Sequence, residues 1–197
     1  MVEKLKYFKD KPKLADIVDL VIVCLVTLII GSLISRFIIL IGFVPSGSME
    51  TTIMEGDQIL ANRTAYWNED PQRGDIVVFY APDEKANGKI VHYVKRVIGL
   101  PGETVSFQDG YVYINGVLLE EPYIDVKTYS KDQDTFVVPE GHYFMLGDNR
   151  GGSLDSRAWD NSFVPRADIQ GEVFLKYSLK LDNLHAKRIY SYNDYNF

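Results

Sequence analysis

The sequence is poor in the residues that build metal, disulfide and nucleotide sites. Its 197 residues include one cysteine, Cys24, which excludes an internal disulfide and a cysteine-based zinc site. Because Cys24 lies among Val, Leu and Ile, it is also a poor thiol nucleophile. The three histidines are far apart, and no glycine-rich phosphate loop or dinucleotide-binding fingerprint occurs. We therefore expect no metal and no cofactor.

Positive charge is scarce in most of the chain. Residues 45–197 hold fifteen Lys and Arg against twenty-three Asp and Glu, a net charge of −8, so this part lacks the basic surface that nucleic acid requires. With 46% hydrophobic and 13% aromatic residues, the composition is that of an ordered globular protein. We expect one globular domain with an appendage and no nucleic-acid partner.

A long apolar run lies near the N-terminus. Between residues 17 and 44 the only charged side chains are Asp19 and Arg36, and about 20 apolar residues are enough to cross the hydrocarbon core of a bilayer. The sequence therefore predicts a transmembrane anchor over residues 17–36, preceded by an N-terminal segment over residues 1–16. A buried core helix is the alternative, although a domain of this size rarely contains so long an apolar run.

The charges that flank this run predict its orientation. Five lysines precede it and only Arg36 closely follows it, so the positive-inside rule puts the N-terminus in the cytoplasm and the chain from residue 37 onward outside the cell membrane. A cleavable signal peptide begins in the same way, but Phe-Ile-Ile-Leu-Ile occupies the place of a small-x-small cleavage site. We expect a retained, single-pass anchor in the lipid bilayer.

The rest of the chain predicts an all-β domain over residues 37–180, built from coiled antiparallel sheets, and a C-terminal tail over residues 181–197. Short runs rich in β-branched and aromatic residues alternate with turns, and Asp109-Gly110 and Asn115-Gly116 are strong hairpin signals. Residues 183–197 are polar and rich in tyrosine, which predicts a loosely held tail. The expected strands cover residues 58–62, 75–80, 90–98, 104–108, 111–114, 136–138, 142–146 and 169–177.

Two segments contain candidate groups for nucleophilic catalysis. Ser48 lies in Pro-Ser-Gly-Ser-Met (residues 45–49), where small side chains leave room for another backbone and a main-chain N–H could bind an oxyanion. The same residues also fit an ordinary turn. Lys95 lies in a run of valine and isoleucine, where burial and the neighbouring charge of Arg96 would lower its pKa and make it a general base. An exposed strand lysine is the alternative.

A third segment, residues 147–157, reads Gly-Asp-Asn-Arg-Gly-Gly-Ser-Leu-Asp-Ser-Arg. Its acids and arginines can form ion pairs that hold a loop still, although alone it also fits a solvated turn. In this order, behind an N-terminal anchor, the three segments resemble the type I signal peptidases, which are membrane-bound serine proteases. The resemblance covers about residues 43–177 and includes Arg-Gly-Asp-Ile-Val-Val-Phe at residues 73–79.

The resemblance implies a role for each matching residue. Ser48 corresponds to the nucleophile and Lys95 to the general base of the family. The main-chain N–H of Ser48 and the hydroxyl of Ser46 would hold the oxyanion, and Ser153 matches the residue that orients the lysine amine. The charged residues that would brace the site are Asp148 with Arg96 and Asp155 with Arg157.

The resemblance also implies the substrate, which is the signal peptide of an exported preprotein, bound as an extended strand and cut after a small-x-small site. A rival function is a catalytically weak or inactive relative that assists the assembly of surface pili, but such proteins lose the nucleophile or the base. A self-cleaving repressor would need a DNA-binding domain in place of the apolar run. The wall positions that match the family's pockets are Val44, Met49, Ile53, Ile59, Val78, Tyr93 and Val94.

Overall fold

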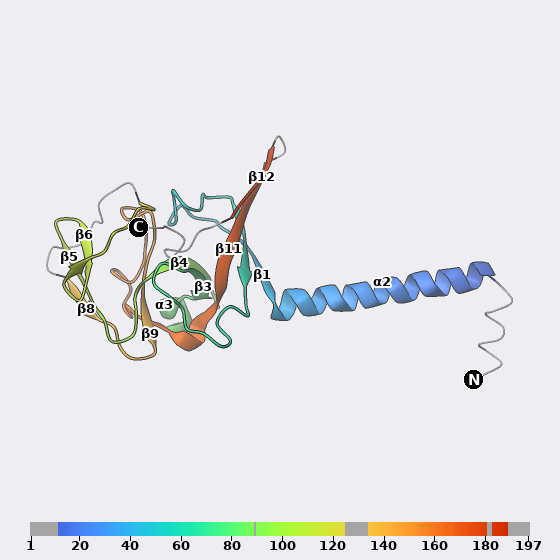
Figure 1. The fold of residues 1–197 in the computed structure, drawn as a ribbon, viewed down its shortest axis with the longest axis horizontal. Helices are drawn as coiled ribbons and strands as arrows, with labels where there is room; N and C mark the ends of the chain where they lie inside the picture. Colours follow the sequence, from blue (N-terminus) through green and yellow to red (C-terminus); the bar gives the residue numbers. More distant parts are fainter. Residues whose placement is uncertain (1–11, 89, 125–133, 181–182, 189–197) are drawn as a thin grey trace. The chain divides into compact units, whose positions relative to one another are not determined.

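The computed structural model describes residues 12–88, 90–124, 134–180 and 183–188, and the chain divides into two compact units, Met1–Ile39 and Leu40–Phe197. The first unit contains one helix, α2 (Pro12–Phe37), drawn in blue in Figure 1. Its stretch Leu14–Phe37 reaches a mean hydropathy of 2.9, and none of that window is buried. The helix, which includes the predicted anchor, is long and apolar enough to cross a membrane.

The second unit is built around an eight-stranded sheet with the order β1-β2-β11-β3-β4-β9-β10, in which β12 pairs with β11. The pairs with a recorded register are antiparallel. The strands are β1 (Ile39–Phe43), β2 (Gln58–Asn62), β3 (Ile76–Tyr80), β4 (His92–Gly99), β9 (His142–Leu146), β10 (Val164–Pro165), β11 (Ile169–Lys180) and β12 (Asn183–Arg188).

The central strand β3 shows why this sheet forms. Ile76 and Val78 lie in one hydrophobic cluster with Met49 and Ile53, while Val77 and Phe79 lie in a second cluster with tryptophan and tyrosine side chains. Because successive side chains of a strand point to opposite faces, a strand buried on both faces has to be apolar throughout. The sequence Ile-Val-Val-Phe meets this requirement.

A smaller sheet has the order β7-β6-β5-β8. Both of its predicted hairpin turns have positive φ at their two central residues, 53° and 82° at Asp109-Gly110 and 51° and 80° at Asn115-Gly116, as type I′ turns require. A third hydrophobic cluster joins residues of β4 and β9 to residues of this sheet. Its strands are β5 (Thr104–Gln108), β6 (Tyr111–Ile114), β7 (Val117–Leu118) and β8 (Thr135–Val137).

The structure confirms the expected fold class and all eight expected strands, four of them with the expected bounds. The expectation of a loose tail is wrong for β12, which pairs with β11 from Leu175↔Arg188 to Lys180↔Asn183. Backbone hydrogen bonds make this pairing, so the polar sequence does not prevent it. Residues 1–11 and 189–197 lie outside the described residues. Further elements that were not expected are β1, β7, β10, the short helix α3 (Pro82–Ala86) and the 3₁₀ turn Arg166–Asp168.

Candidate active site

The turn that contains Ser48 is held by buried apolar residues before and after it. Val44 exchanges backbone hydrogen bonds with Gly56 and Asp57, and its side chain is buried beside Met49 and Ile53. Between Val44 and Met49 the chain is more accessible, because Pro45 and Ser46 are exposed and Gly47 and Ser48 are half-buried. The segment is therefore fixed at both ends and open in the middle.

Lys95 and Ser48 are in direct contact, although 47 positions separate them in the sequence. The Nζ atom of Lys95 lies 2.6 Å from the Oγ atom of Ser48. The lysine lies on β4, opposite Val77 of β3, and only 4% of its surface is exposed. The hydroxyl of Ser46 donates a longer hydrogen bond of 3.4 Å to the same Oγ atom. The exposed-lysine alternative is therefore wrong, because this side chain is buried.

Burial lowers the pKa of Lys95 from its ordinary value of 10.5 to about 8. The carboxylates of Asp155 and Asp148 act in the opposite direction and raise it. From the sequence, the charge of Arg96 is expected to lower this pKa as well, but in the structure the Arg96 guanidinium is paired with Asp148. Desolvation of the ammonium is therefore the cause of the lowered pKa, and it acts against two nearby carboxylates.

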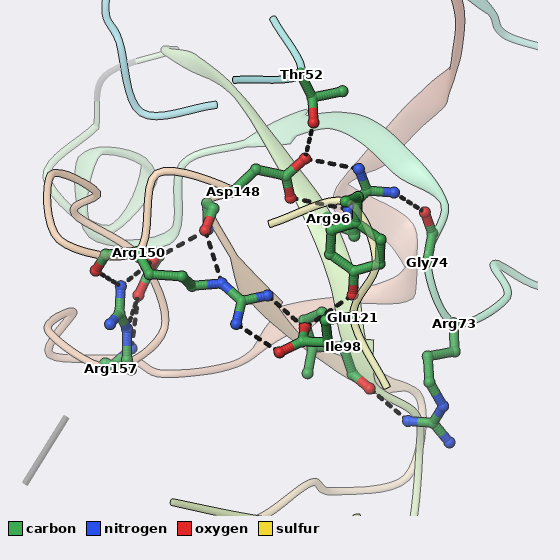
Figure 2. Close-up of polar contacts among 12 residues, drawn as sticks. Thr52, Arg73, Gly74, Arg96, Ile98, Glu121, Asp148, Arg150 and Arg157 are labelled. Carbon is green, nitrogen blue, oxygen red and sulfur yellow. Dashed lines mark hydrogen bonds and ion pairs between the residues drawn. The ribbon is translucent and has the colours of Figure 1, made fainter. Parts of the chain in front are cut away.

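A buried ion pair lies directly beside the candidate base. Arg96 donates from Nε to Oδ1 of Asp148 at 2.8 Å and from Nη2 to Oδ2 at 2.6 Å, and both side chains are fully buried. Figure 2 shows that Asp148 also accepts a hydrogen bond from Thr52 and that Arg96 donates to the Gly74 carbonyl. The guanidinium of Arg96 also lies 3.8 Å from the centre of the Tyr123 ring. The pair therefore has hydrogen-bond partners on several sides, as a buried charge requires.

The same loop holds two further ion pairs. Asp155 pairs with Arg157 and also accepts a hydrogen bond from the Gly147 backbone N–H. Arg150 is fully buried and pairs in a bidentate manner with Glu121, which lies between β7 and β8 (Figure 2). The sequence analysis missed Glu121, because no local pattern links it to a partner 29 residues later.

Ser153 and Gly147 pack tightly against the turn that contains Ser48. A Cβ atom placed on Gly147 would lie 2.2 Å from the Oγ atom of Ser153 and 2.3 Å from the carbonyl oxygen of Ser48, so only glycine fits here. The Ser153 hydroxyl is buried and, within the described part of the chain, has no hydrogen-bond partner. The role of Ser153 in orienting the lysine therefore remains a prediction from the resemblance.

An open cavity of about 370 Å³ borders both Ser48 and Lys95. Four of the seven expected wall residues line it, namely Val44, Met49, Tyr93 and Val94. The other three are buried in the hydrophobic cluster behind the cavity and do not line it. The sequence analysis did not identify six of the lining residues, which are Phe43, Pro45, Val91, His92, Gly152 and Leu154.

The chain is similar to known proteins along most of its length. Residues 1–178 match the family described as signal peptidase, peptidase S26. The probable signal peptidase I-2 of Synechocystis sp. is 39% identical in an alignment of 137 residues that covers 68% of this chain and 61% of that protein. Signal peptidase I of Bacillus amyloliquefaciens is 35% identical in an alignment of 163 residues that covers 78% of this chain and 84% of that protein. A crystal structure of a signal peptidase I from Enterococcus faecalis V583 is 39% identical, covering 53% of this chain and 97% of that one with a TM-score of 0.44.

Proposed function

Because this chain belongs to the signal peptidase family, peptidase S26, we propose that it is a serine endopeptidase that removes signal peptides from exported preproteins. The proposed nucleophile is Ser48 and the proposed general base is Lys95. The observation that supports this best is the 2.6 Å contact between a serine hydroxyl and a buried lysine amine. A serine hydroxyl is a weak nucleophile on its own and needs an adjacent base, and both groups border one cavity.

In the proposed reaction, the neutral amine of Lys95 accepts the hydroxyl proton of Ser48 while Oγ attacks the carbonyl carbon of the scissile peptide. The main-chain N–H of Ser48 and the hydroxyl of Ser46 stabilise the negative oxygen of the tetrahedral intermediate. The C–N bond then breaks, and the leaving amine takes the proton from the lysine ammonium. Lys95 next accepts a proton from water as the water oxygen attacks the acyl carbon. The bond from that carbon to Ser48 Oγ then breaks, and the lysine ammonium returns the proton to Oγ, which restores the hydroxyl and the neutral amine.

The cavity and the strands beside it favour an extended substrate. On one side, β4 pairs with β3 over residues 92–96. On its other side, the recorded register with β9 begins only at Arg96↔Leu146, so within the described residues β4 presents a strand edge over residues 92–95. An extended peptide can add to such a strand edge through main-chain hydrogen bonds. The cavity walls are mostly apolar, and the cavity is small. These features fit short apolar side chains close to the scissile bond, as in a small-x-small cleavage site.

The helix α2 fits the proposed function as the anchor that keeps the enzyme in the cell membrane. The lysine-rich N-terminus would lie in the cytoplasm and residues from 37 onward outside it, by the positive-inside rule. The lipid bilayer and the signal peptides that enter it are the proposed partners.

The full chain in detergent micelles, incubated with a preprotein, tests this function. We expect the wild type to release the signal peptide, with mass spectrometry placing the cut after a small-x-small site. Ser48→Ala and Lys95→Ala should abolish cleavage, whereas Lys85→Ala, which removes an exposed lysine, should not. Cleavage that survives Ser48→Ala or Lys95→Ala contradicts the dyad. A wild type that cleaves no preprotein leaves the role in pilus assembly as the better explanation.

A further inference from the structure

Asn149 makes two hydrogen bonds to the turn that contains Ser48. Its side-chain Nδ2 donates to the carbonyl oxygen of Gly47 at 2.9 Å, and its backbone N–H donates to the carbonyl oxygen of Ser48 at 3.2 Å. These bonds join the loop over residues 147–157 to both peptide groups that flank the candidate nucleophile. Neither the sequence analysis nor the mechanism above uses Asn149.

The bond to Gly47 bears on the proposed oxyanion donor because of peptide geometry. The carbonyl of Gly47 and the N–H of Ser48 belong to one planar, trans peptide group, in which they point in opposite directions. The Gly47 carbonyl accepts a second hydrogen bond, from the Glu50 backbone N–H at 3.1 Å. Asn149 therefore shares with Glu50 the task of fixing the direction of this carbonyl, and with it the direction of the Ser48 N–H. Hydrogen bonding at the carbonyl also polarises the peptide group and strengthens its N–H as a donor.

Asn149 is itself held firmly in place. Its Oδ1 accepts a hydrogen bond from the Gly152 N–H at 3.2 Å, which fixes the rotation of the amide and leaves Nδ2 directed at Gly47. On either side of it, Asp148 and Arg150 are buried in the ion pairs with Arg96 and Glu121 (Figure 2). A donor placed between two buried ion pairs is already ordered, so it loses little conformational entropy when it orients the turn that contains Ser48.

We propose that Asn149 is a positioning residue that aims the Ser48 main-chain N–H at the oxyanion through the shared Gly47–Ser48 peptide group. This inference rests on the proposed function. It assigns Asn149 an effect on the transition state and not on the ground state, because the negative oxygen exists only after attack. It also separates Asn149 from the groups that set the pKa of Lys95, which are burial, Asp155 and Asp148.

Two variants test the inference in the full chain. Asn149→Ala removes the side-chain bond, and Asn149→Asp keeps the shape and the acceptor for Gly152 but replaces the donor with a carboxylate oxygen. Removal of a complete oxyanion donor lowers kcat by about 100- to 1000-fold, so misdirection of one should lower kcat by about 10- to 100-fold in both variants, with KM within about twofold. For Asn149→Ala the midpoint of the pH–rate profile should equal that of the wild type. For Asn149→Asp the new carboxylate can shift this midpoint, so kcat is compared on the alkaline plateau, where Lys95 is neutral in both proteins.

The affinity for a peptide aldehyde distinguishes the proposed positioning role of Asn149 from a purely structural role, which would leave this affinity unchanged relative to that for an ordinary peptide. Its carbon bonds to Ser48 Oγ, the hydroxyl proton passes to Lys95, and the adduct oxygen occupies the oxyanion position. Aldehyde affinity should fall by the same factor as kcat, while the affinity for an uncleavable peptide stays constant. The matched control is Asn87→Ala, which removes a 2.9 Å bond from an asparagine Nδ2 to a backbone carbonyl far from Ser48 in the sequence.

The possible outcomes distinguish a failure of the proposed peptidase function from a failure of the proposed role of Asn149. If the wild type neither cleaves a preprotein nor binds the aldehyde, the proposed function itself fails. If the wild type is active and Asn149→Ala keeps kcat and aldehyde affinity within about twofold, only the role of Asn149 is overturned. The same holds if both variants lower the affinity for the uncleavable peptide as much as for the aldehyde.

Discussion

Lys95 illustrates how one buried side chain can be prepared for chemistry at a cost to stability. Burial in an apolar strand disfavours its ammonium, which lowers its pKa to about 8. At neutral pH the folded protein therefore carries a proton on this amine only against an unfavourable desolvation term, whereas the unfolded chain carries it freely. In the proposed mechanism this amine accepts the proton of Ser48, and the cost of burying its charged form makes the folded state less stable.

The pH dependence of activity should follow the pKa of Lys95. Only the neutral amine can accept the proton of Ser48, so kcat/KM should rise with pH, with a midpoint at about 8. A profile measured from about pH 6 to pH 10 checks this. Asp155→Asn removes the carboxylate that raises the pKa most, so its midpoint should lie at lower pH. A flat wild-type profile would contradict the assignment of Lys95.

The same pKa predicts the sign of a stability change. Between about pH 8 and pH 10 the unfolded chain binds the Lys95 proton and the folded protein does not, so the free energy of unfolding should rise with pH across this window. Denaturant titrations of the wild type and of Lys95→Met measure the effect. The methionine variant should lack this part of the rise and should be more stable than the wild type at pH 7.

The substitution Gly147→Ala should lower activity, because the space around Gly147 has no room for a methyl group. In Gly147→Ala the new methyl group would overlap the Ser153 hydroxyl and the Ser48 carbonyl oxygen, so the loop and the turn that contains Ser48 must shift relative to each other. Because a displacement of about 1 Å can cost about 100-fold in rate, kcat should fall by about that factor. Steady-state kinetics with a melting curve as control check this. Wild-type kcat in a folded variant would show that the turn tolerates the shift.

At the scale of elements, the candidate site is a junction between β4, the loop over residues 147–157 and the segment that follows β7. The strands and the two hairpin turns could be predicted because local patterns specify them. The pair Ser48–Lys95 could be predicted only from the family resemblance, because each local segment also fits an ordinary turn or an exposed strand lysine. Glu121, Tyr123 and Asn149 could not be assigned a role, because their contacts are with residues distant in the sequence. The two-residue strands β7 and β10 are too short to show a pattern.

The ion pair that links β4 to this loop should be costly to break. Asp148→Asn leaves the fully buried Arg96 without its counter-charge, and such a change costs about 3 to 5 kcal/mol. Asp70→Asn is the control, because Asp70 pairs with Arg166 while its own side chain is 75% exposed. That change should cost less than about 1 kcal/mol. Urea denaturation of both variants measures the difference, and equal losses would contradict this account.

At the scale of the whole molecule, the chain joins an apolar helix to a β-rich unit of ordinary globular composition. The predicted span over residues 17–36 lies within α2, and the helix extends beyond it at both ends, to Pro12 and Phe37. The exact ends were not predictable, because flanking residues continue a helix without adding to its apolar run. Length and composition alone were enough to identify the element itself.

Charges in the middle of α2 should release the chain from membranes. Each Asp at a helix centre costs about 3 kcal/mol on insertion, so Leu25→Asp with Ile29→Asp costs about 6 kcal/mol. That is of the order of what the thirteen Leu, Ile and Val residues between positions 17 and 34 contribute. We expect the double variant in the soluble fraction after alkaline extraction, and Leu25→Ile with Ile29→Leu in the membrane fraction. Retention of the double Asp variant would contradict membrane anchoring by this helix.

The amine of Lys95 lines a cavity and releases its proton near pH 8, whereas an ordinary lysine stays protonated to about pH 10.4. At mildly alkaline pH its lone pair is therefore available for covalent modification while surface lysines are still masked by their protons. A small carbamoylating or aldehyde reagent should therefore tag this position ahead of the surface lysines. Because the amine borders an open cavity, the residue offers a handle for selective chemical labelling of the folded protein.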